Sequence, residues 1–455
     1  MAEQELSKRK RRRSRASRFR TRLCKEGAYQ LVIMAFLLVA ALIRQINLLL
    51  LIFSGLAVPL LWNLYFVRSS LKKLSFRRLA PEFCSAGDRI VIDIECTNER
   101  DRRNSWVVVA TDILRLVNPD ESRRLIAARP IEASTVFSRI KPGETVRESY
   151  EGRLTQRGEY RLGPLQVSTR FPLGLIKRSF RYRLPQTIIV HPRLGKLTRA
   201  WRENSQRSFQ GGISVAQQVG VVEAEFHGLR EYRSGDSKNW IHWKTTARRG
   251  EPIVRQFEQQ RNLDMVIVLD LWIPQYPRLQ DLETVEIAVS FAATLLSTQA
   301  KRGLGNLVLA THHHEPKTLR GVASHGLVRE ALTDLALARC SREDHLPELL
   351  SKGVGQPAAR QGEIVVISTR YNDLNDVERF ADVGSSSMRD DWRRRVTYVN
   401  CARPEFSQLF EPPHSIDDDQ QSTLQLPDSG FASKQLQEQQ RGRGKKHRRV
   451  VSGKS

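Results

Sequence analysis

Apolar residues are concentrated in two runs that follow a basic segment. Residues 28–43 and 46–67 contain no charged side chain, and Arg44 and Gln45 lie between them. The second run has 22 residues, which as a helix is enough to cross a hydrocarbon layer of about 30 Å. The first has 16 residues and needs local bilayer thinning or interfacial flanks to span. This pattern predicts a hairpin of two transmembrane helices over residues 28–67.

Two other structures share part of this pattern: a cleaved signal peptide and a buried helical hairpin. The basic region before the first run is unusually long for a signal peptide, and a second apolar run follows at once. We therefore favour the membrane anchor over both alternatives.

Short alternating segments follow the anchor. Residues 89–96 alternate apolar and polar side chains, as a half-buried strand does. Residues 107–114, 166–169 and 187–190 are also short and rich in β-prone residues, and Gly and Pro turn signals separate them. The pattern predicts a β-sandwich-like domain over residues 79–200.

The pattern changes again after residue 258, where buried strands alternate with helices. Near-continuous apolar strands separated by helices are typical of a mostly parallel sheet with helices on both faces. An α/β domain over residues 259–405 is therefore expected. The predicted strands are 263–269, 306–310, 363–367 and 396–399, and the predicted helices are 282–300 and 326–337.

Charge is concentrated at the two ends of the chain. The net charge is +25, of which residues 1–26 carry +8 and residues 431–455 carry +7. We treat residues 1–27 as a basic tail and residues 411–455, rich in Pro, Ser, Gln and Asp before their basic end, as a disordered basic tail.

Basic residues also flank the anchor on both sides, whereas only Arg44 lies between its apolar runs. The positive-inside rule then predicts a multi-pass protein of a bacterial inner membrane with its soluble domains and both termini in the cytoplasm. Juxtamembrane basic clusters are attracted to anionic lipid. Nucleic-acid binding by the tails is the alternative, but no aromatic-rich groove or nucleic-acid motif accompanies them.

The five cysteines are odd in number and show no metal or redox spacing, so reduced thiols are expected. We expect no cofactor.

A distinctive block of charged and aromatic residues spans 223–258, with the sequence EFHGLREYRSGDSKNWIHWKTTAR at 225–248. Asp236 after Gly235 is expected to cap a helix that ends at Gly250. On that helix Trp240, Trp243, Lys244 and Ala247 would share a face. The residues singled out as structural or partner-binding are Glu225, Phe226, Gly228, Arg230, Tyr232, Gly235, Asp236, His242, Trp243, Lys244 and Arg248.

This block resembles the signature of the bacterial family called domain of unknown function 58 (DUF58). The matching positions are Glu225-Phe226, residues 228–232, Gly235-Asp236, residues 241–244 and Ala247-Arg248. The resemblance covers roughly residues 28–400. It implies an α/β part like a von Willebrand factor A domain and a partner of the MoxR-type AAA+ ATPase class.

A von Willebrand factor A domain can hold a divalent cation through Asp-x-Ser-x-Ser at the end of its first strand, because hard cations prefer oxygen ligands. Here Asp270 takes the first position, but Trp272 and Pro274 replace both serines. We therefore expect a degenerate site without metal. Three histidines, residues 312–314, follow a predicted strand and are expected in a solvated loop.

Three roles remain open for the block: a buried charge network that joins domains, a partner-binding surface, or acid–base chemistry through His242 with Asp236 or Glu225. The main hypothesis is a non-catalytic, membrane-anchored interaction protein that works with a MoxR-type ATPase in assembling or maturing complexes. The alternatives are a hydrolase-like enzyme that uses residues 225–248, or nucleic-acid or anionic-surface binding by the tails. The oligomeric state stays open.

Overall fold

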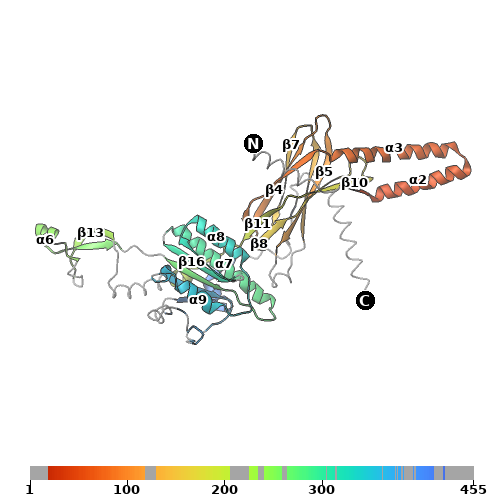
Figure 1. The fold of residues 1–455 in the computed structure, drawn as a ribbon. Coiled ribbons are helices and arrows are strands. Elements are labelled where there is room, and N and C mark those ends of the chain that lie inside the picture. Colours follow the sequence, from red (N-terminus) through yellow and green to blue (C-terminus); the bar gives the residue numbers. More distant parts are fainter. Residues whose placement is uncertain are drawn as a thin grey trace, which may run out of the picture. The chain divides into compact units, whose positions relative to one another are not determined.

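A computed structural model of the chain describes residues 19–117, 130–204, 225–233, 240–258, 264–303, 305–312, 315–360, 362–372, 374, 376, 378–380, 383, 393, 396–413 and 424–425. The chain divides into two compact units (Figure 1). The first consists of Met1–His191 with Ser415–Ser455, and the second of Pro192–His414.

Two long apolar helices, α2 (Lys25–Arg44) and α3 (Asn47–Ser70), form an antiparallel pair in the first unit (Figure 1). Gln45 adopts a left-handed conformation with φ 52° and ends α2. The Gln30 amide Nε2 of α2 donates to the Leu56 carbonyl of α3 at 2.9 Å. This hydrogen bond joins the two helices. Only 17% of the most apolar window of α2 and 6% of that of α3 are buried, so neither is a buried core helix, and both are long and apolar enough to be candidates for crossing a membrane.

The first unit also contains two sheets, whose described strand pairs are all antiparallel but one. The larger runs β1-β10-β9-β5-β8-β11-β3 with β6 on β5, and the smaller runs β2-β4-β7-β21. The exception is β3 on β11, which is parallel. The strands are β1 (Arg20–Leu23), β2 (Leu74–Leu79), β3 (Phe83–Ser85), β4 (Arg89–Asn98), β5 (Ser105–Leu116), β6 (Ile131–Ile140), β7 (Thr145–Arg153), β8 (Gly158–Leu162), β9 (Leu165–Thr169), β10 (Ile176–Tyr182), β11 (Gln186–His191) and β21 (Leu424–Gln425).

Alternation of side chains builds the core between the two sheets. In β4 every second residue is buried, so Ile90, Ile92, Ile94 and Cys96 point inward, as the sequence predicts, while Val91 lies on the exposed side. Ile92 and Ile94 of β4 belong to one core cluster with Val108 and Leu114 of β5, which lies in the other sheet. One shared core therefore holds both sheets.

The second unit contains a five-stranded sheet in the order β17-β16-β15-β18-β19. Its strand pairs are parallel except for β17, which lies antiparallel at the edge. The sequence predicts all of these strands but β17, and it predicts both α7 and α8 but not α9. The elements are β15 (Met265–Asp270), α7 (Leu279–Arg302), β16 (Asn306–His312), β17 (Pro316–Val322), α8 (His325–Leu337), α9 (Leu346–Val354), β18 (Glu363–Ser368) and β19 (Val396–Asn400), with 3-10 turns at Pro357–Arg360 and Pro404–Gln408.

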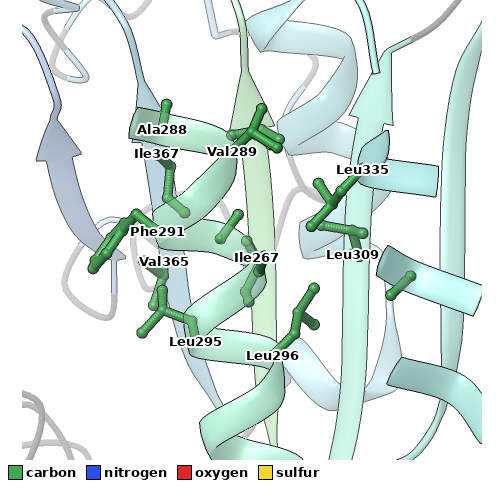
Figure 2. Close-up of a cluster of buried hydrophobic side chains, with 14 of the residues drawn as sticks. Ile267, Ala288, Val289, Phe291, Leu295, Leu296, Leu309, Leu335, Val365 and Ile367 are labelled. Carbon is green, nitrogen blue, oxygen red and sulfur yellow. The ribbon is translucent and has the colours of Figure 1, made fainter. Parts of the chain in front are cut away.

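Helices cover both faces of this sheet. Successive side chains of a strand point to opposite faces, and every residue of β15 is buried, so both faces must be covered. Ile267 lies in the cluster formed with α7 and α8, whereas Val268 lies in the cluster formed with α9. Figure 2 shows the first cluster, with Phe291 of α7 beside Val365 and Ile367 of β18.

The boundary between the units lies before residue 192, and not at residue 200 as the sequence pattern indicates. Strand β12 (Lys196–Leu197) pairs with β20 (Phe410–Glu411) within the second unit. Trp201 is 3% exposed and packs edge-on against Phe291 at 5.1 Å between ring centroids. The segment after residue 191 therefore belongs to the core of the α/β unit.

Candidate functional site

The carboxyl ends of β15 and β18 bring together two polar side chains. These parallel strands pair Asp270 with Ser368, and both residues are buried. The Ser368 hydroxyl donates to Asp270 Oδ2 at 2.8 Å. Burial raises the pKa of the Asp270 carboxyl, while the Ser368 hydrogen bond and the charge of Arg370 oppose that rise.

A guanidinium group lies beside this carboxylate. Arg370 Nε is 3.6 Å from Asp270 Oδ2, and the same side chain forms an ion pair with Asp344. Its Cζ lies 5.0 Å from the centroid of the Trp272 ring, a cation–π distance. Arg379 also pairs with Asp344, at 2.7 Å. Positive charge is thus supplied at Asp270 by the chain's own arginines.

The loop after β18 folds back over this edge through further hydrogen bonds. The Asn372 amide Nδ2 donates to Ser368 Oγ at 2.9 Å, and the Tyr398 hydroxyl donates to the Arg370 carbonyl at 2.6 Å. Arg379 donates to Asn372 Oδ1 at 2.7 Å. Burial is the main cause that raises the pKa of the Tyr398 phenol. Most polar groups of this edge are bonded to one another, whereas the buried Arg370 Nε makes no hydrogen bond within the described residues.

Trp272, which replaces a serine of the cation-binding pattern, has structural contacts of its own. The Trp272 indole Nε1 donates to the Arg342 carbonyl at 3.0 Å, and the Trp272 carbonyl accepts from Thr369 Oγ1 at 2.6 Å. Pro274 contributes no side-chain oxygen. In the described part of the chain no three His, Cys, Asp or Glu side chains are grouped as metal ligands would be. Binding of a cation at Asp270 would have to displace the charge of Arg370.

His312 differs from the solvated loop position expected for it. It ends β16 and its ring stacks on that of His345, with centroids 3.5 Å apart and an interplanar angle of 8°. His345 Nε2 lies 3.0 Å from Ser341 Oγ. These residues line a small hollow next to Asp270. His313 and His314 lie outside the described residues.

The signature block forms a small substructure of its own. Strand β13 (Glu225–Glu231) pairs with β14 (Ile253–Glu258), with a register irregularity between Phe226 and Gly228. The short helix α6 (Trp243–Arg249) lies between these strands in the chain. The block is therefore a β-hairpin with a helical insertion.

Two hydrogen bonds join the start and the body of the helix to the second strand. The backbone N–H of His242 donates to the Ile253 carbonyl at 2.8 Å, and the N–H of Ile253 donates to Thr246 Oγ1 at 3.0 Å. His242 Nδ1 lies 2.7 Å from Thr245 Oγ1. Gly250 takes a left-handed conformation and ends the helix, as its sequence position predicts.

One expectation for this block needs correction, and another is not tested. The helix begins at Trp243, so Trp240 lies before it and does not share a helical face with Trp243, Lys244 and Ala247. Gly235 and Asp236 lie outside the described residues, and the expected Asp236 cap stays a prediction.

Within the hairpin itself, most of the described charged side chains lie at the surface, and the expected junction between the domains stays a prediction. Lys244, Arg248 and Glu231 are exposed, and Arg230, half-buried, donates to the Glu231 carbonyl at 3.1 Å. Trp243 is 69% exposed and Trp240 is 47% exposed. Glu225, Phe226 and Gly228 lie on β13, opposite residues of β14. The Tyr232 N–H donates to the Pro252 carbonyl. The block presents aromatic and basic side chains outward.

Sequence reasoning locates Asp270 and the signature block but misses Arg370, Asp344, Arg379 and Tyr398. A signal for Arg370 exists, because it follows the predicted strand 363–367 by three residues. Asp344 and Arg379 lie 26 residues before and nine residues after Arg370, and only the folded chain brings the three together.

Residues 228–392 match the family model described as "Protein of unknown function DUF58". The uncharacterized protein YeaD of Bacillus subtilis is 27% identical over 250 residues, which cover 55% of this chain and 59% of that relative. The match thus spans less than two thirds of the relative's length.

Among solved structures, a CARDB domain from Pyrococcus furiosus matches with 9% identity and a TM-score of 0.17, over 26% of this chain and 94% of that domain. The sporulation control protein Spo0M of Bacillus subtilis matches with 10% identity and a TM-score of 0.16, over 41% of this chain and 66% of that one. At such TM-scores these likenesses carry no argument.

Proposed function

Because this chain belongs to the DUF58 family, whose function is unknown, we propose that it is a non-catalytic, membrane-anchored interaction protein. Its partner is a cytoplasmic protein, in the first place a MoxR-type AAA+ ATPase that acts in assembling or maturing complexes. The two-sheet unit is β-sandwich-like, and the α/β unit is built like a von Willebrand factor A domain.

One observation carries this proposal: the family signature presents a large tryptophan to solvent. Trp243 is 69% exposed, next to the exposed basic residues Lys244 and Arg248. Tryptophan and arginine are enriched among the residues that contribute most to protein–protein binding, whereas Lys is depleted there. The exposed Trp243, with Trp240 (47% exposed) and Arg248 in the same block, therefore supplies side chains of the kind that a protein partner would cover.

The polar edge at Asp270 supports the non-catalytic part of the proposal. Its carboxylate is hydrogen-bonded to Ser368 and lies beside Arg370, and the neighbouring groups bond to one another. Such a network suits a rigid support for binding loops.

Replacing Trp243 with Ala in the full-length protein should weaken binding to the purified MoxR-type ATPase of the same organism by about 30-fold, the loss of an interface hot spot. Binding is measured with the detergent-solubilised protein on a sensor surface. Because the side chain is exposed, the melting temperature should hardly change. The matched control is Tyr276→Ala, which truncates an aromatic side chain that is 85% exposed elsewhere.

Equal binding by the Trp243 variant and the wild type would refute the assigned surface. Failure of the wild type to bind would refute the partner class. A marked drop in melting temperature for Trp243→Ala would instead favour the buried-junction role of the block.

We also propose that α2 and α3 cross a bacterial inner membrane as a hairpin, with the soluble units and both termini in the cytoplasm. Strand β1 precedes α2, yet it pairs with β10, which follows α3. Two segments paired in one sheet lie on the same side of a bilayer, and basic residues flank both helices.

Reporter fusions after residue 78 and at the C-terminus should therefore both give cytoplasmic signals. A fusion placed at Gln45, in the turn between the helices, is the control and should give a periplasmic signal. A periplasmic signal from either of the first two fusions would contradict the hairpin.

A further inference from the structure

A short turn of mostly apolar residues joins β9 to β10. The two strands pair antiparallel, and residues 170–175 connect them with the sequence RFPLGL, which contains no acidic residue. Pro172 and Leu173 are exposed, Leu173 to 52%. We call residues 170–175 the β9–β10 turn. What its exposed apolar side chains meet depends on where the turn lies along the two apolar helices.

On α2 the turn lies at the start of the helix. The backbone N–H of Cys24, which precedes α2, donates to the Leu175 carbonyl at 2.9 Å. Gly27, in the first turn of α2, approaches the same carbonyl so closely that a Cβ at this position would collide with its oxygen. Gly27 directly precedes the charge-free run 28–43. The β9–β10 turn is therefore level with the beginning of that run.

On α3 the turn lies near the end of the second apolar run. The N–H of Ile176, directly after the turn, donates to the Asn63 side-chain oxygen at 3.1 Å. Asn63 stands four residues before the end of the charge-free run 46–67, a distance of about 6 Å along a helix. Trp62 and Tyr65, 58% and 55% exposed, flank Asn63 in the chain, and such side chains are typical of the membrane–water interface. Both helices thus place the turn at the boundary of the hydrocarbon layer.

Strand β10 leads away from this boundary. The Arg178 guanidinium donates to the Arg68 carbonyl, five residues beyond Asn63 on α3. The Tyr182 hydroxyl donates to the Leu74 carbonyl, which follows α3 in the chain. Later residues of β10 therefore meet later positions of the chain that leaves the apolar run. The β9–β10 turn, which precedes β10, is at the end of the strand that faces the bilayer.

From this placement we infer that the β9–β10 turn inserts into the interfacial layer of the membrane, with Pro172 and Leu173 among the lipid headgroups and the upper parts of the acyl chains. The inference rests on the proposed membrane hairpin of α2 and α3. Arg170 is the only charged residue of the turn, and a basic side chain is tolerated at this depth because its charge can reach the headgroups. The turn is a third contact with the bilayer besides the two helices, and it fixes how the two-sheet unit is oriented to the membrane.

The test uses the full-length wild-type protein in phosphatidylcholine nanodiscs that contain a phospholipid with a photoactivatable diazirine on its acyl chain. After illumination, mass spectrometry maps the peptides that carry lipid. Peptides from α2, from α3 and from residues 170–175 should carry it, because an interfacial segment lies roughly 5–10 Å into the boundary between headgroups and acyl chains. Peptides from β4 should not, although Val91 is 47% exposed on that strand.

A charged substitution tests the role of the exposed leucine. Crosslinking of residues 170–175 should fall by about tenfold in Leu173→Asp, because transfer of a leucine side chain out of water is favourable and that of a carboxylate is not. Crosslinking of α3 should stay as in the wild type. Amide hydrogen exchange in β9 and β10 should also stay unchanged, since substitution of an exposed side chain seldom affects the fold. The matched control is Leu194→Asp, at a leucine 44% exposed in the second unit, which should keep the lipid crosslinks of the turn.

Lipid on α2 and α3 but not on residues 170–175 of the wild type overturns the inference and leaves the membrane hairpin standing. Equal crosslinking of the turn in Leu173→Asp and in the wild type overturns it as well. Absence of lipid from both helices overturns the hairpin and this contact with it.

Discussion

Replacing Asp112 with Ala is expected to lower the free energy of unfolding of the two-sheet unit by about 3–5 kcal/mol. Asp112 of β5 is 0% exposed and forms a 2.7 Å ion pair with Arg78 of β2. Tyr150 of β7 donates its hydroxyl to the other Asp112 oxygen at 2.8 Å. Because β5 lies in one sheet and β2 and β7 in the other, the ion pair spans the core. The substitution therefore leaves the buried Arg78 guanidinium without its carboxylate partner.

A double substitution separates this cause from general loss of packing. Arg78→Met with Asp112→Leu removes both charges and should be markedly less destabilising than Asp112→Ala alone, since an apolar pair leaves no buried charge. Tyr150→Phe removes one hydrogen bond and should cost about 1–2 kcal/mol. Thermal unfolding of the detergent-solubilised chain, with hydrogen exchange assigned to residues 74–191, measures these effects. A cost below about 1 kcal/mol for Asp112→Ala would show that the pair is not essential.

Trp201→Ala is expected to destabilise the α/β unit by about 3–5 kcal/mol, the usual cost of truncating a buried aromatic residue. Trp201 lies before the signature block in the chain, yet its ring packs against Phe291, which also contacts the rings of Phe406 and Phe410 at 5.2 Å. Loss of the indole leaves a cavity beside Phe291, whose position in the core appears in Figure 2.

The measurement is hydrogen exchange in β15 and α7, because residues of both elements belong to the same core cluster as Trp201. Trp62→Ala, at a position 58% exposed on α3, is the matched control and should leave exchange in the α/β unit unchanged. Unchanged exchange in Trp201→Ala would place residues 192–204 outside the core and restore the boundary near residue 200.

Periodicity made most elements of this fold predictable. The apolar runs at 28–43 and 46–67 became α2 and α3, and the alternation at 89–96 became β4. The α/β strands were located to within a few residues, because a strand covered on both faces needs consecutive apolar side chains. Strand β17 was missed because it is an edge strand with a mixed burial pattern, and α9 because it has only nine residues.

The candidate site was predictable only in part. The sequence indicates Asp270 at a strand end and shows that Trp272 and Pro274 cannot supply side-chain oxygens. Arg370 lies beside the Asp270 carboxylate because β15 and β18 pair in parallel register. That register relates two segments of the chain, so neither segment alone indicates it.

The sequence by itself determined the two apolar helices, the β-rich and α/β regions and the family signature, because each depends on residues close together in the chain. Tertiary structure alone decided which distant groups meet. Arg78 finds Asp112 across the core, Trp201 joins the α/β unit, and Arg22 lies opposite Lys177 although 155 positions separate them. Such pairs depend on strand register and sheet order, which the whole chain sets through burial of its core, and a local pattern of side chains carries no record of them.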